Sequence, residues 1–230
     1  MRALIFNILF YTLFVIGMLA ISPLLLGSRR VTTRGIMFVT KCLVVLQRIF
    51  GIRIQVRGKE NIPEGGFLIA AKHQSMWETI MLPDLFVDPA FIYKQELANI
   101  PLFGLFMRKF DMVPIDRKKG ATALRNMTVL AARKIAEGRQ LIIFPEGTRR
   151  PLGAPPDYKT GIVLLYDVTK APVLPIAQNS GALWSNYFWR GQTGTIVIDI
   201  LPLIAAGLPK KEFLQKLQDE IETAMQKMSA

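Results

Sequence analysis

Cysteine and histidine are almost absent from the 230 residues: the chain has one of each, Cys42 and His73. A single cysteine excludes an internal disulfide and a zinc site built from several cysteines, and a single histidine excludes a histidine-rich metal site. Cys42 lies within the apolar stretch 39–49, which favours a buried structural thiol over a nucleophile. The Gly-x-Ser-x-Gly pattern of serine hydrolases is also absent. We therefore expect neither a cysteine- or histidine-rich metal site nor a serine or cysteine nucleophile.

Acidic residues are in deficit, since 17 Asp and Glu face 29 Lys and Arg and give a net charge of +12. A basic surface attracts nucleic acid, anionic lipid or acidic proteins. The basic residues are dispersed, without the basic stripe and interleaved aromatics of a nucleic-acid-binding domain. The charge therefore favours a lipid surface or an acidic protein and argues against nucleic acid.

The chain is long enough for one domain with a real core, and a second full domain is not expected. Hydrophobic residues make up 51% and charged residues 20%, which argues against a polytopic membrane protein. This mixture predicts one globular domain with a membrane-facing part.

The membrane-facing part is predicted in residues 1–50. Residues 3–26 carry no charge and are long enough to cross a bilayer as a helix. A signal peptide is the alternative, but the run exceeds the usual apolar region of roughly 7–15 residues, which favours a retained anchor. Three arginines and a second apolar helix candidate at 35–50 follow, and this basic cluster favours the cytoplasmic face of the cell inner membrane. A two-helix hairpin in one leaflet and a single span with a surface helix both stay open.

Residues 51–230 alternate between strand and helix patterns. Such alternation predicts an α/β domain with a mainly parallel sheet. The expected strands are 52–57, 66–71, 91–94, 112–115, 140–144, 173–177 and 195–200, and the expected helices are 76–86, 121–137, 161–169 and 210–228.

His73 follows the strand-like run Phe67–Ala71, at the end of a strand where α/β folds place reactive groups. Ser75 and Glu78 have the spacing of a capping box, which needs no catalysis, and a lone histidine is often structural. If a helix begins near Ser75, however, Glu78 lies in its first turn and reaches back to the imidazole. A carboxylate on one ring nitrogen fixes the tautomer while the other nitrogen takes a proton.

A second polar turn follows the apolar run 141–144 and reads Pro-Glu-Gly-Thr-Arg-Arg. Gly147 lets a ligand approach the backbone closely, and the guanidinium of Arg149 suits a phosphate. Glu146 is negatively charged and does not itself bind phosphate favourably. We expect it to orient Arg149 or to accept a hydrogen bond from a ligand hydroxyl. A turn with a solvated arginine pair is the alternative interpretation.

Together these segments resemble the glycerolipid acyltransferase family, and most of all its bacterial lysophosphatidate acyltransferase branch. The resemblance covers about residues 50–205. Its four blocks, in family order, are 73–78, 110–117, 144–149 and 173–177. The family usually has aspartate where this chain has Glu78, so one additional methylene enters the pair with His73.

The resemblance implies acyl transfer from a thioester of acyl carrier protein or coenzyme A to the sn-2 hydroxyl of 1-acyl-glycerol-3-phosphate, forming phosphatidic acid. It implies His73 as the base and Glu78 as its orienting carboxylate, and no metal or organic cofactor. The residues that it implies for the glycerol phosphate are Glu146, Gly147, Thr148, Arg149 and Arg117, with Lys159 and Lys72 as weaker candidates.

Three alternatives remain open. Glycerol-3-phosphate or another lyso-lipid is a possible acceptor, since the wider family shares these motifs. The same pair of residues also suits a thioester or lysolipid hydrolase. A non-enzymatic module that binds anionic lipid explains the charge and the anchor, but not His73.

Overall fold

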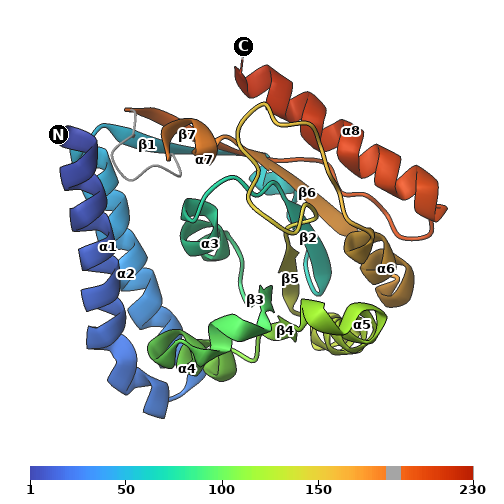
Figure 1. The fold of residues 1–230 in the computed structure, drawn as a ribbon, viewed down its shortest axis with the longest axis horizontal. Coiled ribbons are helices and arrows are strands. Elements are labelled where there is room, and N and C mark those ends of the chain that lie inside the picture. The colour runs from blue at the N-terminus through green and yellow to red at the C-terminus, as the bar shows by residue number, and fades with distance from the viewer. Residues whose placement is uncertain (185–192, 230) are drawn as a thin grey trace.

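The computed structural model describes residues 1–184 and 193–229, and Figure 1 shows one mixed sheet with helices on both of its faces. The α-helices are α1 Arg2–Ile21, α2 Arg29–Ile49, α3 Trp77–Met81, α4 Pro101–Lys109, α5 Gly120–Ala136, α6 Thr160–Thr169, α7 Ser180–Leu183 and α8 Lys210–Ser229. The strands are β1 Ile52–Arg57, β2 Phe67–Ala71, β3 Pro89–Lys94, β4 Val113–Ile115, β5 Gln140–Ile143, β6 Val173–Gln178 and β7 Gly194–Ile200. Short 3-10 helices are η1 Ser22–Leu26, η2 Lys59–Asn61, η3 Leu82–Leu85, η4 Gln95–Asn99 and η5 Arg117–Lys119.

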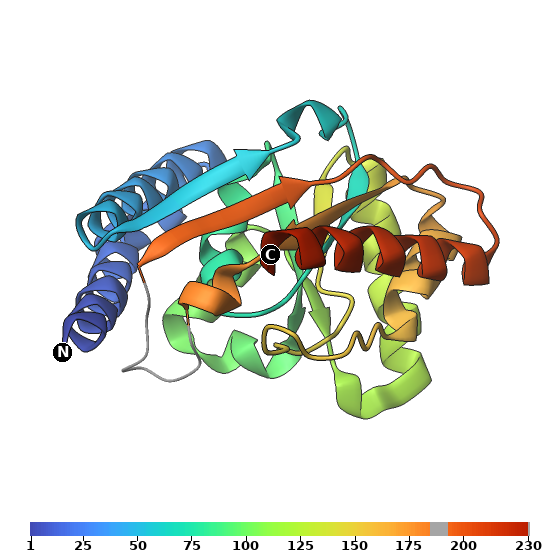
Figure 2. The same cartoon turned by 90° about the horizontal axis from the view of Figure 1, so that it is seen from above.

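The sheet has the strand order β1-β7-β6-β2-β5-β3-β4, and each neighbouring pair is parallel except the antiparallel pair β6–β7. Figure 2 shows β1 and β7 running side by side between the N-terminal helices and α8. The predicted α/β fold with a mainly parallel sheet is confirmed. Strand β2 shows why: all five of its residues are buried, and alternate side chains enter the cores on opposite faces of the sheet.

Each face of the sheet has its own apolar core. One core combines alternate strand residues with α1, α2, α3 and α4, and the other combines the remaining strand residues with α5, α6 and α8. Phe10 of α1 and Leu43 of α2 are both 0% exposed. The N-terminal helices therefore pack against the sheet, and the proposed division into residues 1–50 and 51–230 stays a prediction.

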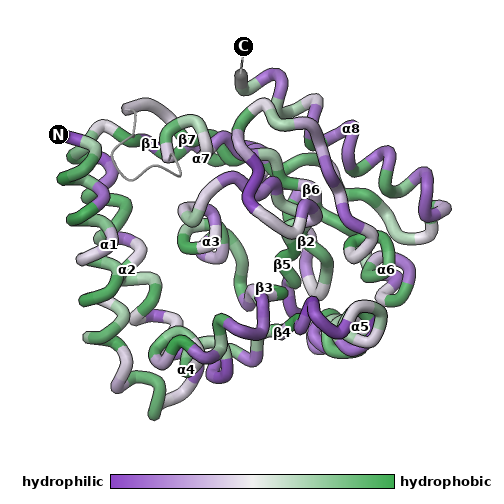
Figure 3. The backbone as a smooth tube through the Cα atoms, viewed as in Figure 1, coloured by the Kyte–Doolittle hydropathy of each residue, from purple (hydrophilic) through white to green (hydrophobic). Residues whose placement is uncertain are grey.

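The other face of these N-terminal helices is apolar and exposed. Figure 3 shows green, hydrophobic stretches along both α1 and α2. Among the described residues, one helical segment is long and apolar enough to cross a membrane, Arg2–Leu26. The exposed apolar residues of this face are Leu4, Ile5, Ile8, Leu9, Val15, Ile16, Leu19, Leu26, Val31, Met37, Phe38, Val45 and Ile49.

Two expected helices have other bounds in the structure, and one helix was not expected. The second N-terminal helix begins at Arg29, not residue 35, because the Ser28 hydroxyl accepts from the backbone N–H of Val31 at 3.4 Å and caps it. The helix expected over 76–86 is divided into α3 and η3, since Pro83 lacks the N–H needed to continue an α-helix. Helix α4 did not stand out from the sequence pattern.

Candidate active site

The site lies where three neighbouring parallel strands, β6, β2 and β5, end at the same edge of the sheet. The chain leaving each strand supplies polar groups: residues 72–78 after β2, 144–150 after β5 and 178–181 after β6. Carboxyl ends of parallel strands are where α/β folds assemble ligand sites. The strand order therefore brings together the His73 and Gly147 segments predicted from the sequence, and it adds the segment 178–181 at the end of β6.

His73 lies in the loop between β2 and α3, and its Nδ1 is 2.9 Å from Oε1 of Glu78. The predicted contact between the two side chains is confirmed. Because the carboxylate can only accept, the neutral imidazole donates from Nδ1–H, and the lone pair remains on Nε2. Nε2 makes no hydrogen bond to any residue within 1–184 or 193–229, so it is free for a substrate proton.

The Glu78 carboxylate is 0% exposed and is surrounded by donors. Besides His73, its Oε1 accepts from the backbone N–H groups of Gln74 at 2.6 Å and Ser75 at 2.8 Å. Its Oε2 accepts from the hydroxyls of Ser75 at 2.6 Å and Ser180 at 2.8 Å. Burial raises the pKa of the Glu78 carboxyl. The hydrogen bonds from His73 and Ser75, and the positive charge of His73 when it is protonated, outweigh this effect, so the pKa lies below its ordinary value.

Half of the capping box predicted from Ser75 and Glu78 is formed, because the Ser75 hydroxyl binds the backbone N–H of Trp77 and not that of Glu78. Helix α3 begins at Trp77, whose backbone N–H donates to the Ser75 hydroxyl at 3.1 Å. Glu78 returns to the N–H of Ser75, as in a capping box. Capping and orientation of the imidazole therefore use the same carboxylate, and neither role excludes the other.

This depressed pKa predicts how stability depends on pH. A carboxyl whose pKa is lower in the folded state contributes stability that is fully present above its unfolded value, near 4.5, and is lost as pH falls through the folded value. We expect the thermal midpoint of the wild type to fall more steeply than that of Glu78→Gln as the pH is lowered from about 5 to about 3. Circular-dichroism melts of both proteins measure this. Parallel curves would contradict the stabilising role of the ionised carboxylate.

The imidazole is also held by its surroundings after β5. The Phe144 ring stacks on it with centroids 4.0 Å apart and an angle of 16° between the planes. The backbone N–H of His73 donates to Oε2 of Glu146 at 3.2 Å, and its carbonyl accepts from the backbone N–H of Arg150 at 2.8 Å. The ring and backbone of His73 are therefore both fixed by residues 144–150.

Basic side chains surround the turn at Gly147. This glycine has φ +67°, a region that favours glycine. A Cβ at this position would lie 3.9 Å from Nη2 of Arg117 and 3.6 Å from Cγ of Lys159, so both side chains border the turn. Arg117 and Arg149 are exposed, and their guanidinium groups form no ion pair or hydrogen bond with the described part of the chain. Lys159 pairs with Asp157 at 2.7 Å. Two free guanidinium groups and a glycine turn suit a phosphate.

Two candidates from the same segments are buried instead. Glu146 is 0% exposed, with Lys72 Nζ 2.8 Å from its Oε1, and Lys72 is buried as well. Neither side chain reaches the surface that carries Arg117 and Arg149. The expectation that Glu146 contacts the acceptor, and the weaker one for Lys72, are therefore not supported by their positions, because each charge is already matched inside the protein.

Two residues that contact the His73–Glu78 pair were not identified from the sequence. Ser180, which follows β6, binds Glu78 from 102 residues away, and Phe144 stacks on His73. Their positions in the sequence could have pointed to them. Ser180 comes shortly after the fourth block, 173–177, and Phe144 ends the apolar run before Glu146. Thr148 is exposed in the basic turn, where a ligand can reach it.

Comparison with known proteins addresses the family directly. A sequence model of the acyltransferase family matches residues 53–179, which include His73, Glu78 and the Gly147 turn. The chain belongs to the acyltransferase family. The matched region of this acyltransferase begins in β1 and ends just after β6, so α1, α2 and α8 lie outside it.

Curated relatives of this acyltransferase are named for one activity. The 1-acyl-sn-glycerol-3-phosphate acyltransferase of Pseudomonas aeruginosa is 38% identical over 158 residues, which are 69% of this chain and 62% of the relative. The enzyme of the same name from Bacillus subtilis is 29% identical over 195 residues, 81% of this chain and 94% of the relative. The alignment thus spans less than two thirds of the Pseudomonas relative's length.

A solved structure supports the fold. The 1-acyl-sn-glycerophosphate (LPA) acyltransferase from Thermotoga maritima superimposes with a TM-score of 0.77 at 23% identity, covering 100% of this chain and 98% of that one. The N-terminal helices and α8 are therefore part of the shared fold.

Proposed function

We propose that this acyltransferase transfers an acyl chain from a thioester to the sn-2 hydroxyl of 1-acyl-glycerol-3-phosphate, forming phosphatidic acid. The observation that carries the proposal is the His73–Glu78 pair, with Nδ1 and Oε1 2.9 Å apart, on the same sheet edge as a glycine turn flanked by Arg117. A base beside a phosphate-binding turn suits a phosphorylated alcohol. The activity for which the relatives from Pseudomonas and Bacillus are named supports the proposal.

The proposed reaction uses His73 twice. Nε2 takes the proton of the acceptor hydroxyl as its oxygen attacks the thioester carbonyl, and Glu78 stabilises the imidazolium that forms. The carbon–sulfur bond then breaks, and the departing thiolate takes the proton from Nε2, which returns His73 to its neutral form. Ester and thiol are the products, and the steps involve no acyl-enzyme, metal or organic cofactor.

Arg117 and Arg149 are proposed to bind the acceptor phosphate, with Gly147 permitting the approach and Thr148 and Lys159 at its border. Both guanidinium groups are exposed, and a guanidinium binds phosphate with two parallel hydrogen bonds. Lys159 is a weaker contributor because its ammonium already pairs with Asp157. Glu146 contributes from beneath the turn, through its bonds with Lys72 and His73.

The exposed apolar face of α1 and α2 is proposed to hold the enzyme at a membrane, where its acceptor and product reside. Burying such side chains in lipid is favourable at about 25 cal/mol per Å² of apolar area. Arg29, Arg30 and Arg34 at the start of α2 favour anionic headgroups and the cytoplasmic face of the inner membrane. The net charge of +12 suits the anionic acceptor and also an acidic acyl carrier protein. A thioester of coenzyme A is the alternative acyl donor.

An acceptor panel tests the substrate assignment. With one labelled thioester donor, we expect kcat/KM for 1-acyl-glycerol-3-phosphate to exceed that for glycerol-3-phosphate and for lysophosphatidylcholine. Running the panel with both an acyl carrier protein thioester and an acyl-coenzyme A thioester identifies the donor. A clear preference for glycerol-3-phosphate or for lysophosphatidylcholine would reassign the acceptor.

Arg149→Ala is expected to raise the KM for lysophosphatidate by about 10- to 100-fold, with a smaller change in kcat. A hydrogen bond to a charged group contributes about 1.5–3 kcal/mol, and about 1.4 kcal/mol corresponds to a factor of ten. Steady-state kinetics at saturating donor measures this.

Arg133→Ala is the matched control, because Arg133 is an exposed arginine near the C-terminal end of α5 that pairs with Glu137 at 2.8 Å. Its kinetics are expected to equal those of the wild type. An unchanged acceptor KM in Arg149→Ala would argue against the phosphate role of that side chain.

A further inference from the structure

A buried lysine next to His73 joins two carboxylates that are far apart in the chain. Lys72 Nζ lies 2.8 Å from Oε1 of Glu146 and 2.7 Å from Oε1 of Glu222, and the Lys72 side chain is 4% exposed. Burying an ammonium is costly unless opposite charges and hydrogen bonds compensate it. Two carboxylates around one lysine provide that compensation, so the three side chains act as a unit.

Glu222 comes from α8, outside the residues 53–179 that match the acyltransferase family. Its Oε1 also accepts from the hydroxyl of Tyr158 at 3.0 Å. Burial raises the pKa of the Tyr158 phenol, and the neighbouring Glu222 raises it further, so the hydroxyl stays protonated and donates. Glu222 is therefore held in place from the loop that precedes α6 as well as from Lys72.

The three residues connect to the base through Glu146. Its Oε2 accepts the backbone N–H of His73 at 3.2 Å, while its Oε1 contacts Lys72. The Lys72–Glu146 contact is a charge contact rather than a well-directed hydrogen bond, whereas Lys72–Glu222 is a hydrogen bond. Glu222 thus holds the Lys72 ammonium in place. Because the ammonium is held there, it does not draw the Glu146 carboxylate away, and Oε2 of Glu146 keeps its hydrogen bond from the backbone N–H of His73. Without Glu222, Glu146 alone must neutralise Lys72.

We propose that Glu222 is a positioning residue for His73, acting through Lys72 and Glu146. It touches no reacting atom, so its effect is on the geometry of the base. The inference rests on the proposed function insofar as His73 is the base of acyl transfer. It assigns to the C-terminal helix a part in the active site.

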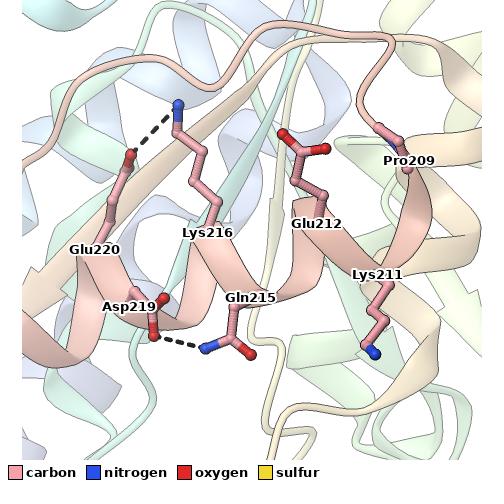
Figure 4. A pocket seen from close by; sticks show the side chains of 7 residues that line it. All are labelled: Pro209, Lys211, Glu212, Gln215, Lys216, Asp219 and Glu220. Carbon is pink, nitrogen blue, oxygen red and sulfur yellow. Dashed lines mark hydrogen bonds and ion pairs between the residues drawn. The ribbon is translucent and has the colours of Figure 1, made fainter.

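The test compares Glu222→Ala and Glu222→Gln with Glu220→Ala in the full-length protein in detergent. Glu220 is a close match, since its side chain is 27% exposed against 22% for Glu222, and it also lies on α8. Figure 4 shows Glu220 with Lys216 of the same helix, 3.9 Å away, at a surface hollow that none of the site residues line.

Two readouts separate positioning from folding. The first is kcat and acceptor KM, measured well below the melting temperature of each variant. The second is the amide signal of His73 in protein labelled with 15N-histidine. Because the chain has one histidine, that spectrum has one backbone amide peak, which reports the bond to Glu146 without any substrate.

We expect Glu222→Ala to lower kcat by about 10- to 100-fold, since a small misplacement of a catalytic group costs up to about that factor, while the acceptor KM changes less than threefold. The His73 amide peak shifts in Glu222→Ala and, by less, in Glu222→Gln, which keeps the shape and the acceptor oxygen. Glu220→Ala leaves both readouts at wild-type values.

An amide peak that stays in place in both Glu222 variants overturns the inference, and so does a wild-type kcat in folded Glu222→Ala. A wild type that makes no phosphatidate refutes the proposed function instead. The amide peak then still decides whether Glu222 positions His73.

Discussion

Replacing His73 with alanine is expected to lower kcat for phosphatidate synthesis by about 10²- to 10⁴-fold, the range that a positioned general base contributes. The chain has no second histidine to take over, and Glu78 is buried behind the imidazole. The variant is expected to fold, because Glu146 and Arg150 bind the backbone of His73, which alanine retains. Its apolar N-terminal face is untouched, so binding to vesicles stays at the wild-type level.

Steady-state rates, a thermal melt and vesicle flotation of His73→Ala measure these three properties together. Loss of rate with an intact melt and intact flotation is the predicted combination. It also excludes a non-enzymatic lipid-binding module, which needs no imidazole. Undiminished phosphatidate synthesis by the folded variant would show that His73 is not the base.

Glu78→Gln is expected to lower kcat by about 10²-fold, with folding preserved at neutral pH. The amide is isosteric, and its oxygen can occupy the Oε1 position and accept from His73, Gln74 and Ser75. Its NH2 group then meets the hydroxyls of Ser75 and Ser180, which can rotate to accept. The tautomer of His73 is kept, and only the negative charge that stabilises the imidazolium is lost.

Two further substitutions at this position separate charge from structure. Glu78→Asp keeps the charge but is shorter by one methylene, so we expect its kcat to lie between those of Glu78→Gln and the wild type. Glu78→Ala leaves buried donors without an acceptor, at about 1–3 kcal/mol each, and is expected to lower the thermal midpoint as well. A wild-type kcat for Glu78→Gln would contradict the electrostatic role of the carboxylate.

The fold was predictable where the signal is local. The fully apolar run of β2 and the alternating run of β1 both stand out, and the glycine at 138, with φ +79°, ends α5 as expected. The packing of α1 and α2 on the sheet was not, because an apolar helix presents the same pattern to lipid and to a protein core. Phe10 and Leu43 enter the core, whereas Ile16 and Phe38 stay exposed.

The site divides in the same way. His73 and Glu78 are five residues apart, so their contact depends only on the local conformation of the chain and could be predicted from the sequence. Ser180 meets Glu78 across 102 residues, and Glu222 meets Lys72 across 150. Such contacts depend on strand order and on where α8 lies, which no local spacing encodes. For Glu146 the local motif was misleading. The motif indicates contact with a ligand, whereas the buried carboxylate contacts Lys72 inside the protein.

Acyl transfer and hydrolysis are distinguished by following the acyl label of a thioester donor in the purified protein, with and without lysophosphatidate. If the His73–Glu78 pair activates the acceptor hydroxyl, label enters phosphatidate only when lysophosphatidate is present, and little free fatty acid forms in its absence. Release of labelled fatty acid at the same rate without the acceptor would show that the pair activates water, and that the protein is a hydrolase.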